Sequence, residues 1–239
     1  MVSKFHPVRA REWVPVHYSE ERWRTLEQLR CEAEKILSAL AEKNIKAFAI
    51  GSLARGDVTP KSDVDIHVSG YVPSFIVAAS LAEHGLRVDH YEVVQATPET
   101  AVKIIAVIDE RTSITIPASR LSKTEEEFGR FAGAVDLDGL RRGLRVPGVN
   151  KRLLLIVPTE YGHAERSVLG FERETANLLG ISLETVQERV RVRTRRAVRA
   201  RSGFFLHKVL PPDSSPEKTL LDLASKLPAL RLKLTGVLT

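Results

Sequence analysis

The sequence predicts a protein of the α/β (α+β) class, with a mixed sheet flanked by helices and a mostly helical C-terminal region. Between residues 45 and 118, short apolar segments alternate with segments of helical periodicity, which is typical of strands connected by helices. After Pro117 the sequence becomes charged, glycine-bearing and weakly periodic, which indicates a boundary. A chain of 239 residues can bury a sizeable core, and we expect two regions, residues 1–120 and residues 121–239.

The elements of the first region follow from local signals. Residues 1–18 mix prolines and aromatics without periodicity and predict an extended segment. Ser19 is a candidate helix N-cap, because two glutamates follow it and a helical pattern continues to about residue 43. Apolar runs then predict strands, and segments of helical periodicity predict helices. For the second of these helices, Pro98 at the first position is a further sign of a helix start. The strands are expected at residues 45–50, 62–68, 86–94 and 112–118, and the helices at residues 73–84 and 98–110.

The second region is predicted to contain a boundary or connecting helix at residues 121–150, a strand at residues 151–159 and largely helical structure beyond. Residues 174–201 have the spacing of a helix-turn-helix, with Gly180 in the turn and Ser182 capping the second helix. An arginine run follows and predicts contact with a nucleic-acid backbone, while the alternative is a solvated helix face. The candidate contacts are Arg189, Arg193, Arg195, Arg196 and Arg199.

Composition limits the classes of protein that need to be considered. The net charge of +6 and the pI near 9.5 allow an anionic partner but also fit an ordinary surface. Abundant arginine with scarce Asn, Gln, Cys and Met is a bias reported in some thermophile families. No signal peptide or apolar stretch of bilayer length is found, so we expect a soluble, cytoplasmic protein without a membrane partner. The single cysteine, Cys31, is expected to pack as a small hydrophobe.

The segment Ala49–Val68, AIGSLARGDVTPKSDVDIHV, carries the candidate chemistry. Side chains alternate along a strand, so Asp63 and Asp65 are expected on one face, where they repel each other unless a cation lies between them. Divalent ions such as Mg²⁺ bind carboxylate and phosphate oxygens together. Gly51 lets a backbone approach closely, and Ser52 offers donors to an anion. The segment therefore predicts a nucleoside triphosphate (NTP) site.

At these residues the sequence resembles the DNA polymerase β-like nucleotidyltransferase superfamily, whose small members carry Gly-Ser-x-x-Arg-Gly followed by Ser-Asp-x-Asp on the next strand. The matching positions are Gly51, Ser52, Arg55, Gly56, Ser62, Asp63 and Asp65. The resemblance covers roughly residues 19–120 and implies the fold of that superfamily, with a third carboxylate on a later strand. Asp89 is the first candidate for this position and Glu92 the second, because Glu92 should face the opposite side from Asp89 in a regular strand.

The resemblance implies metal-dependent transfer of a nucleoside monophosphate (NMP) from an NTP to an acceptor hydroxyl, with release of pyrophosphate. Asp63, Asp65 and Asp89 would hold Mg²⁺ or Mn²⁺, and Gly51 with Ser52 would bind phosphates. Arg55 and Lys61 are further candidate phosphate contacts, or they support the loop. The acceptor is open, nucleic acid included, and His163 is a candidate acceptor contact in an expected polar loop. The alternative function is a nucleotide-sensing, nucleic-acid-binding protein without turnover.

Overall fold

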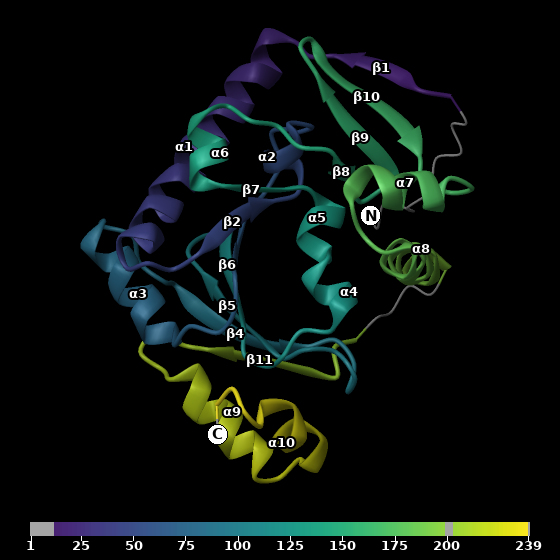
Figure 1. Cartoon of the computed structure of the whole chain (residues 1–239). Coiled ribbons are helices and arrows are strands. Elements are labelled where there is room, and N and C mark those ends of the chain that lie inside the picture. Colours follow the sequence, from purple (N-terminus) through teal and green to yellow (C-terminus); the bar gives the residue numbers. More distant parts are fainter. Residues whose placement is uncertain (1–11, 199–202, 239) are drawn as a thin grey trace. The chain divides into compact units, whose positions relative to one another are not determined.

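The computed structural model describes residues 12–198 and 203–238, and they form two compact units, each assembled from separate parts of the chain (Figure 1). Unit 1 contains the described residues up to Arg30, Ile50–Ser62 and those from Lys123 to the end of helix α8. Unit 2 contains Cys31–Ala49, Asp63–Ser122 and the described residues from Gly203. The predicted boundary after residue 120 lies near one crossing point, Ser122 to Lys123, but the chain crosses between units at other places too.

Unit 2 is built on a mixed sheet with the strand order β11-β4-β5-β6-β3-β2. Strands β3 and β6 are parallel, whereas β2 with β3, β4 with β5, β5 with β6, and β11 with β4 are antiparallel. The strands are β2 (Ala47–Ile50), β3 (Val64–Val68), β4 (His90–Gln95), β5 (Lys103–Val107), β6 (Thr112–Pro117) and β11 (Leu206–Leu210).

Helices flank this sheet, as predicted from the alternation of segments. The long helix α1 (Glu20–Glu42) continues into unit 2, where Ser80 of α3 (Ser74–Glu83) donates its hydroxyl to the Ala39 carbonyl at 2.5 Å. Helices α9 (Pro216–Ala224) and α10 (Pro228–Leu234) complete the unit (Figure 1). One face of the sheet is fully buried, because alternate side chains such as Val64, Ile66, Ile104 and Ile114 are all 0% exposed.

Unit 1 contains an antiparallel sheet of order β1-β10-β9-β8, packed with short helices. Its core consists of Phe131, Val149, Leu153, Leu155, Val168, Ala176, Leu179, Ile181 and Val186. The strands are β1 (Val14–His17), β7 (Ala134–Asp136), β8 (Gly148–Val149), β9 (Leu154–Thr159) and β10 (Gly162–Ser167). The helices are α2 (Ser52–Arg55), α4 (Lys123–Glu126), α5 (Phe128–Ala132), α6 (Leu137–Arg141), α7 (Glu172–Leu179) and α8 (Leu183–Val198).

Most predicted elements of the first region are confirmed, but the helix at residues 98–110 is wrong. Residues Lys103–Val107 form strand β5, whose side chains alternate between buried and partly buried positions. The Pro98 signal belongs to a turn, in which the Gln95 amide donates to the carbonyls of Pro98 and Thr100. Pairing with β4 and β6 overrides the local helical signal. Strands β10 and β11 also lie in a region predicted to be largely helical.

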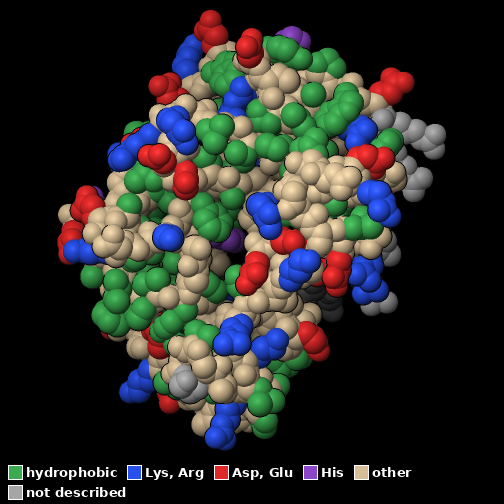
Figure 2. Space-filling model, in the orientation of Figure 1, with side chains coloured by type: hydrophobic (Ala, Val, Ile, Leu, Met, Phe, Trp, Pro, Cys, Tyr) green, Lys and Arg blue, Asp and Glu red, His purple; other side chains and the backbone are tan. Residues whose placement is uncertain are grey.

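The surface mixes both signs of charge. Figure 2 shows Lys and Arg side chains interspersed with Asp and Glu side chains over the visible face. Within the described residues, no helix combines the length and the apolar character that crossing a membrane requires. Cys31 is exposed on α1, so the expectation that it packs as a small hydrophobe is wrong.

Candidate active-site residues

The turn from Gly51 to Gly56 in unit 1 depends on its two glycines. Gly51 has φ 78° and ψ −141°, and Gly56 has φ 100°, conformations that side-chain-bearing residues rarely adopt. The Gly51 N–H donates to the Gly133 carbonyl at 2.9 Å, and the Gly56 N–H donates to the Ser52 carbonyl at 2.6 Å. A Cβ at Gly51 would meet nothing within 4 Å. The backbone at Gly51 is therefore open to the close approach of another group.

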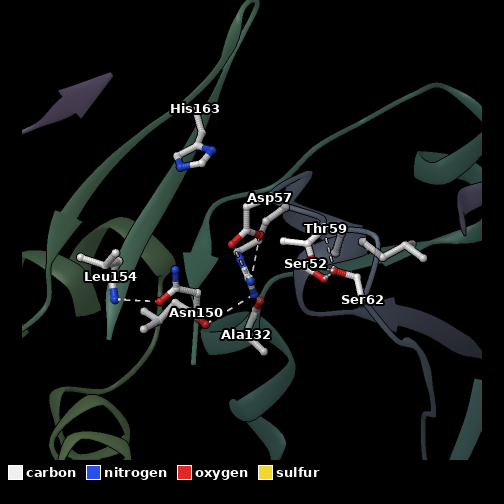
Figure 3. Close-up of polar contacts among 12 residues, drawn as sticks. Ser52, Asp57, Thr59, Ser62, Ala132, Asn150, Leu154 and His163 are labelled. Carbon is white, nitrogen blue, oxygen red and sulfur yellow. Dashed lines mark hydrogen bonds and ion pairs between the residues drawn. The ribbon is translucent and has the colours of Figure 1, made fainter. Parts of the chain in front are cut away.

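Arg55 fastens this turn to the rest of unit 1. The residue is 4% exposed, and its guanidinium donates to the Ala132 carbonyl at 2.5 Å and the Val149 carbonyl at 3.4 Å. Its other terminal nitrogen pairs with Asp57 at 2.8 Å, and Figure 3 shows Asp57 and Ala132 in this network. Both terminal nitrogens already have protein partners. We therefore assign Arg55 to supporting the loop and not to contacting phosphate. Its buried charge needs these protein partners, because an unpaired buried charge is costly.

The Ser52 side chain is connected to the loop that precedes the two aspartates. Its hydroxyl donates to the Ser62 hydroxyl at 3.3 Å, and Ser62 Oγ accepts from the Thr59 N–H at 2.9 Å. These three side chains lie together in Figure 3. Lys61, at the exposed tip of this loop, donates its N–H to Thr59 Oγ1 at 3.3 Å and leaves its ammonium group at the surface. Lys61 is thus placed where a charged ligand can reach it.

Asp63 and Asp65 belong to unit 2, where Asp65 lies on β3 and Asp63 immediately precedes it. Val64, Ile66 and Val68 are buried, whereas Asp65 and His67 are only partly buried, so the strand alternates as predicted. Asp65 Oδ1 accepts a hydrogen bond at 3.3 Å from the hydroxyl of Ser113, its direct neighbour on β6. This alternation places both aspartates on the more accessible face of the sheet.

The strand order contradicts the expectation that Asp89 shares a metal site with Asp63 and Asp65. Strands β5 and β6 lie between β4 and β3. Three spacings of about 4.8 Å separate Asp65 from the start of β4 by ~14 Å, far beyond a shared coordination shell. Asp89 instead accepts a hydrogen bond from His90 Nδ1 at 2.8 Å, with 71% of its side chain exposed.

The second candidate, Glu92, also lies on β4 and is excluded from that metal site for the same reason. The register places it on the face of Asp65, through Ile105, Thr115 and His67 in successive pairings. Its carboxylate contacts His207 Nε2 at 3.1 Å instead. Glu92 therefore lies on the same face of the sheet as Asp65, and it is the strand order that separates the two side chains.

His67 follows Asp65 on the same face of β3. Burial and, to a smaller extent, the nearby Lys103 ammonium lower the pKa of His67 to about 4, so the imidazole is neutral at pH 7. Its ring lies 6.3 Å from the ring of Phe48 on β2, between centroids. His67 therefore adds no positive charge beside the aspartates.

The arginine run divides into two groups. Arg189 lies over the Phe128 ring at 4.9 Å, and Arg193 donates to the Lys151 carbonyl at 2.5 Å, so both fold back onto unit 1. Arg195 is exposed on α8. Arg196 lies in the described backbone of α8 without a described side chain, and Arg199 lies outside the described residues. The run is thus not one continuous exposed face, which corrects the expectation for Arg189 and Arg193.

Backbone hydrogen bonds close the turn between α7 and α8. Gly180 ends α7 with φ 62°, its N–H donates to the Asn177 carbonyl, and the Ile181 N–H donates to the Ala176 carbonyl, as in a Schellman motif. The sequence did not reveal the partner of this turn, Glu127, which is 6% exposed. Its carboxylate accepts from the Ser182 N–H and from the hydroxyls of Ser182 and Thr185.

His163 is not in a polar loop, contrary to expectation. It lies on β10, is 2% exposed and contacts the hydroxyl of Tyr18, whose ring stacks near Arg22. The alternation of "GHAERS" was too polar to indicate a strand, and the pairing of β10 with β1 and β9 decides it.

The residues present fit a divalent cation, although no group of three His, Cys, Asp or Glu side chains with metal-binding geometry occurs in residues 12–198 and 203–238. Mg²⁺ is commonly bound by one or two carboxylates together with substrate phosphates and water. Two aspartates on one accessible strand face supply hard oxygen ligands of this kind. Asp63 and Asp65 are therefore the described residues suited to this ion.

Comparison with known proteins finds one similarity. Residues 30–128 match the family model described as nucleotidyltransferase domain, which covers β2, the Gly51–Gly56 turn and both aspartates. No curated protein and no solved structure matches the chain. This part of the chain is therefore similar to a nucleotidyltransferase domain, and the mixed sheet flanked by helices is consistent with a nucleotidyltransferase fold.

Proposed function

We propose that the protein transfers an NMP from an NTP to an acceptor hydroxyl, with release of pyrophosphate, in the presence of Mg²⁺ or Mn²⁺. The observation that carries this proposal is the pair Asp63 and Asp65 on the accessible face of β3, inside the segment that matches the nucleotidyltransferase domain. Two carboxylates at this spacing repel each other, and a cation bound between them would relieve that repulsion.

The aspartates would hold the cation and the triphosphate together. When bound, Mg²⁺ or Mn²⁺ would neutralise phosphate charge and orient the α-phosphate for attack. Ser113 supports this role, because its hydroxyl donates to one oxygen of Asp65 and so restricts the rotation of that carboxylate. Asp63 and Asp65 are assigned as ligands, and Ser113 as a positioning residue.

The Gly51–Gly56 turn would bind phosphate oxygens. The open space at Gly51 admits a phosphate to the backbone, and the Ser52 hydroxyl offers a donor beside it. Arg55 holds the turn from its buried side, and the exposed Lys61 adds a positive charge on the following loop. Most of the catalytic effect would then come from positioning and charge neutralisation, as in other phosphoryl transfers.

Nucleic acid is one candidate acceptor. The surface that would contact it is limited to the exposed part of α8, which includes Arg195. Each exposed arginine neutralises about one phosphate, so Arg195 contributes little by itself. No observation favours the nucleotide-sensing alternative.

The proposal is tested by incubating the purified chain with each α-³²P-labelled NTP, Mg²⁺ or Mn²⁺, and cell extract, and then identifying what becomes labelled. Asp63→Asn and Asp65→Asn are expected to lose transfer, because the amide carries no charge to hold the cation. Asp222→Asn is the matched control, since Asp222 is an exposed aspartate on α9 of the same unit. Transfer that persists in both site variants would refute the assignment.

A further inference from the structure

An aromatic side chain lies on the same face of the unit 2 sheet as Asp65. Phe48 of β2 pairs directly with His67 of β3, and directly opposed residues of an antiparallel pair project to the same face. His67 follows Asp65 by two positions and shares its face, because side chains alternate along a strand. Phe48, His67 and Asp65 therefore form one continuous patch within unit 2.

Phe48 differs in character from its neighbours on this face. The partly buried positions of β3 and β6 are all polar, and they are Asp65, His67, Ser113 and Thr115. Phe48 is itself only partly buried, so the core does not fully enclose it. An aromatic ring beside a polar, partly open surface is an arrangement on which proteins stack nucleobases.

The rings of Phe48 and His67 lie side by side and are not stacked on each other. Their centroids are 6.3 Å apart, and their planes are tilted by 42°. By comparison, the stacked rings of His17 and Tyr161 have centroids 4.4 Å apart and planes tilted by 21°. Neither Phe48 nor His67 therefore covers the face of the other ring.

The spacing between this pair and Asp65 suits a nucleotide. Two residues of a strand span about 7 Å, which is the separation of His67 from Asp65 along β3. Phe48 is the diagonal neighbour of Asp65 across the strand pair, at about 7–8 Å. In a nucleotide a pentose separates the base from the α-phosphate. A phosphate held at Asp65 through the cation therefore leaves the base within reach of Phe48.

A positive charge lies beside the patch. Lys103 of β5 pairs with Pro117, two positions after Thr115, and so projects to the same face. Its ammonium is close enough to His67 to act on it electrostatically. An ammonium only donates hydrogen bonds, so it suits an acceptor such as the N7 atom, which adenine and guanine carry and pyrimidines lack. A purine also offers the larger ring system for stacking.

We propose that Phe48 stacks against the base of the NTP and that the preferred base is a purine. The edge of the base faces His67 and Lys103, and the triphosphate extends toward Asp65. Stacking holds the base equally in the ground state and in the transition state, so Phe48 contributes to KM more than to kcat. The inference rests on the proposed function for the position of the phosphates, and its residues all belong to unit 2.

The test is calorimetric titration of the full-length chain in Mg²⁺ with inorganic tripolyphosphate and with each of ATP, GTP, CTP and UTP. Tripolyphosphate carries the phosphates without a base, so the ratio of its Kd to the Kd of an NTP isolates what the nucleoside adds. Base stacking should make this ratio at least about fivefold for ATP and GTP. The ratio should be smaller for CTP and UTP, because a pyrimidine stacks over a smaller area.

Phe48→Leu should bring the ratio for ATP and GTP down to that for the pyrimidine NTPs, because leucine is apolar but has no aromatic face. The Kd of tripolyphosphate should stay unchanged in this variant, which also shows that the site is folded. Phe48→Trp should keep or raise the ratio, since it restores an aromatic surface. Phe75→Leu is the matched control, because Phe75 is 70% exposed on α3 of the same unit, and its ratio should equal that of the wild type.

Two outcomes would overturn the inference and leave the proposed function standing. One is a ratio that is the same for all four NTPs, and the other is a purine ratio that Phe48→Leu leaves unchanged. If Phe48→Leu also loses tripolyphosphate, Phe48→Trp decides, and a lower ratio in that variant refutes the stacking. By contrast, tripolyphosphate binding that survives in the Asp63→Asn, Asp65→Asn double variant would refute the metal ligands, while a purine ratio that depends on Phe48 would still support the base site.

Discussion

The Glu127 carboxylate gives a prediction whose size can be worked out from its contacts. One of its oxygens accepts three hydrogen bonds, from the Ser182 N–H at 2.9 Å, the Ser182 hydroxyl at 2.6 Å and the Thr185 hydroxyl at 2.5 Å. Glu127→Gln keeps an acceptor there but removes the charge at the N-terminus of α8. We expect this substitution to destabilise unit 1 while leaving its fold unchanged.

Charged hydrogen bonds contribute about 1 kcal/mol more each than neutral ones, so three bonds imply a loss of about 3 kcal/mol for Glu127→Gln. This is an upper value, because bonds that converge on one oxygen are not independent. Burial opposes ionisation of Glu127, but the hydrogen bonds from Ser182 and Thr185 outweigh it and lower the pKa to about 2. The stabilisation should therefore be fully present above the unfolded pKa, about 4.3, and be lost as the pH falls through 2.

Urea unfolding followed by tryptophan fluorescence measures this loss in the right unit, because both tryptophans, Trp13 and Trp23, belong to unit 1. Glu126→Gln is the control, since Glu126 is exposed, adjacent in sequence and identical in charge change. At pH 7 the free energy of unfolding should fall for Glu127→Gln and stay unchanged for Glu126→Gln. Equal stability of the two variants, or a difference from wild type that is the same at pH 2 and pH 7, would refute the reasoning.

Three further predictions concern the site and the arginines. Asp57→Asn should lower the stability of unit 1 by about 3 kcal/mol, since the buried Arg55 loses its counter-charge; unchanged urea unfolding would contradict this. Ser113→Ala should raise the Mg²⁺ concentration needed for half-maximal transfer by about tenfold, measured by titration, whereas an equal loss at saturating Mg²⁺ would point to another role. In gel shifts against salt, Arg195→Gln should flatten the slope of any nucleic-acid binding by about one ion. Arg193→Gln should change that slope less, because the Arg193 guanidinium already donates to the Lys151 carbonyl.

The sequence by itself determined the elements whose signals are local. Alternation in "SDVDIHV" placed Asp63 and Asp65 on one face of a strand, and the structure has that strand. The glycines of the 51–56 turn, the helix over residues 73–84 and the strand at residues 151–159 were predicted for the same reason. Side-chain periodicity and glycine conformations depend on neighbours in the chain, so the residues themselves carry this information.

Only the tertiary structure decided which strands are neighbours. Periodicity placed Asp89 on a strand, but the insertion of β5 and β6 beside β3 moved it about three strand spacings, ~14 Å, from Asp65. The same pairings turned residues 103–107 from an expected helix into a strand. The sequence did not indicate the buried partners of Arg55, Glu127 and His163, which lie 77, 55 and 145 positions away. Burial of a polar group depends on contacts between distant segments, and no local pattern records them.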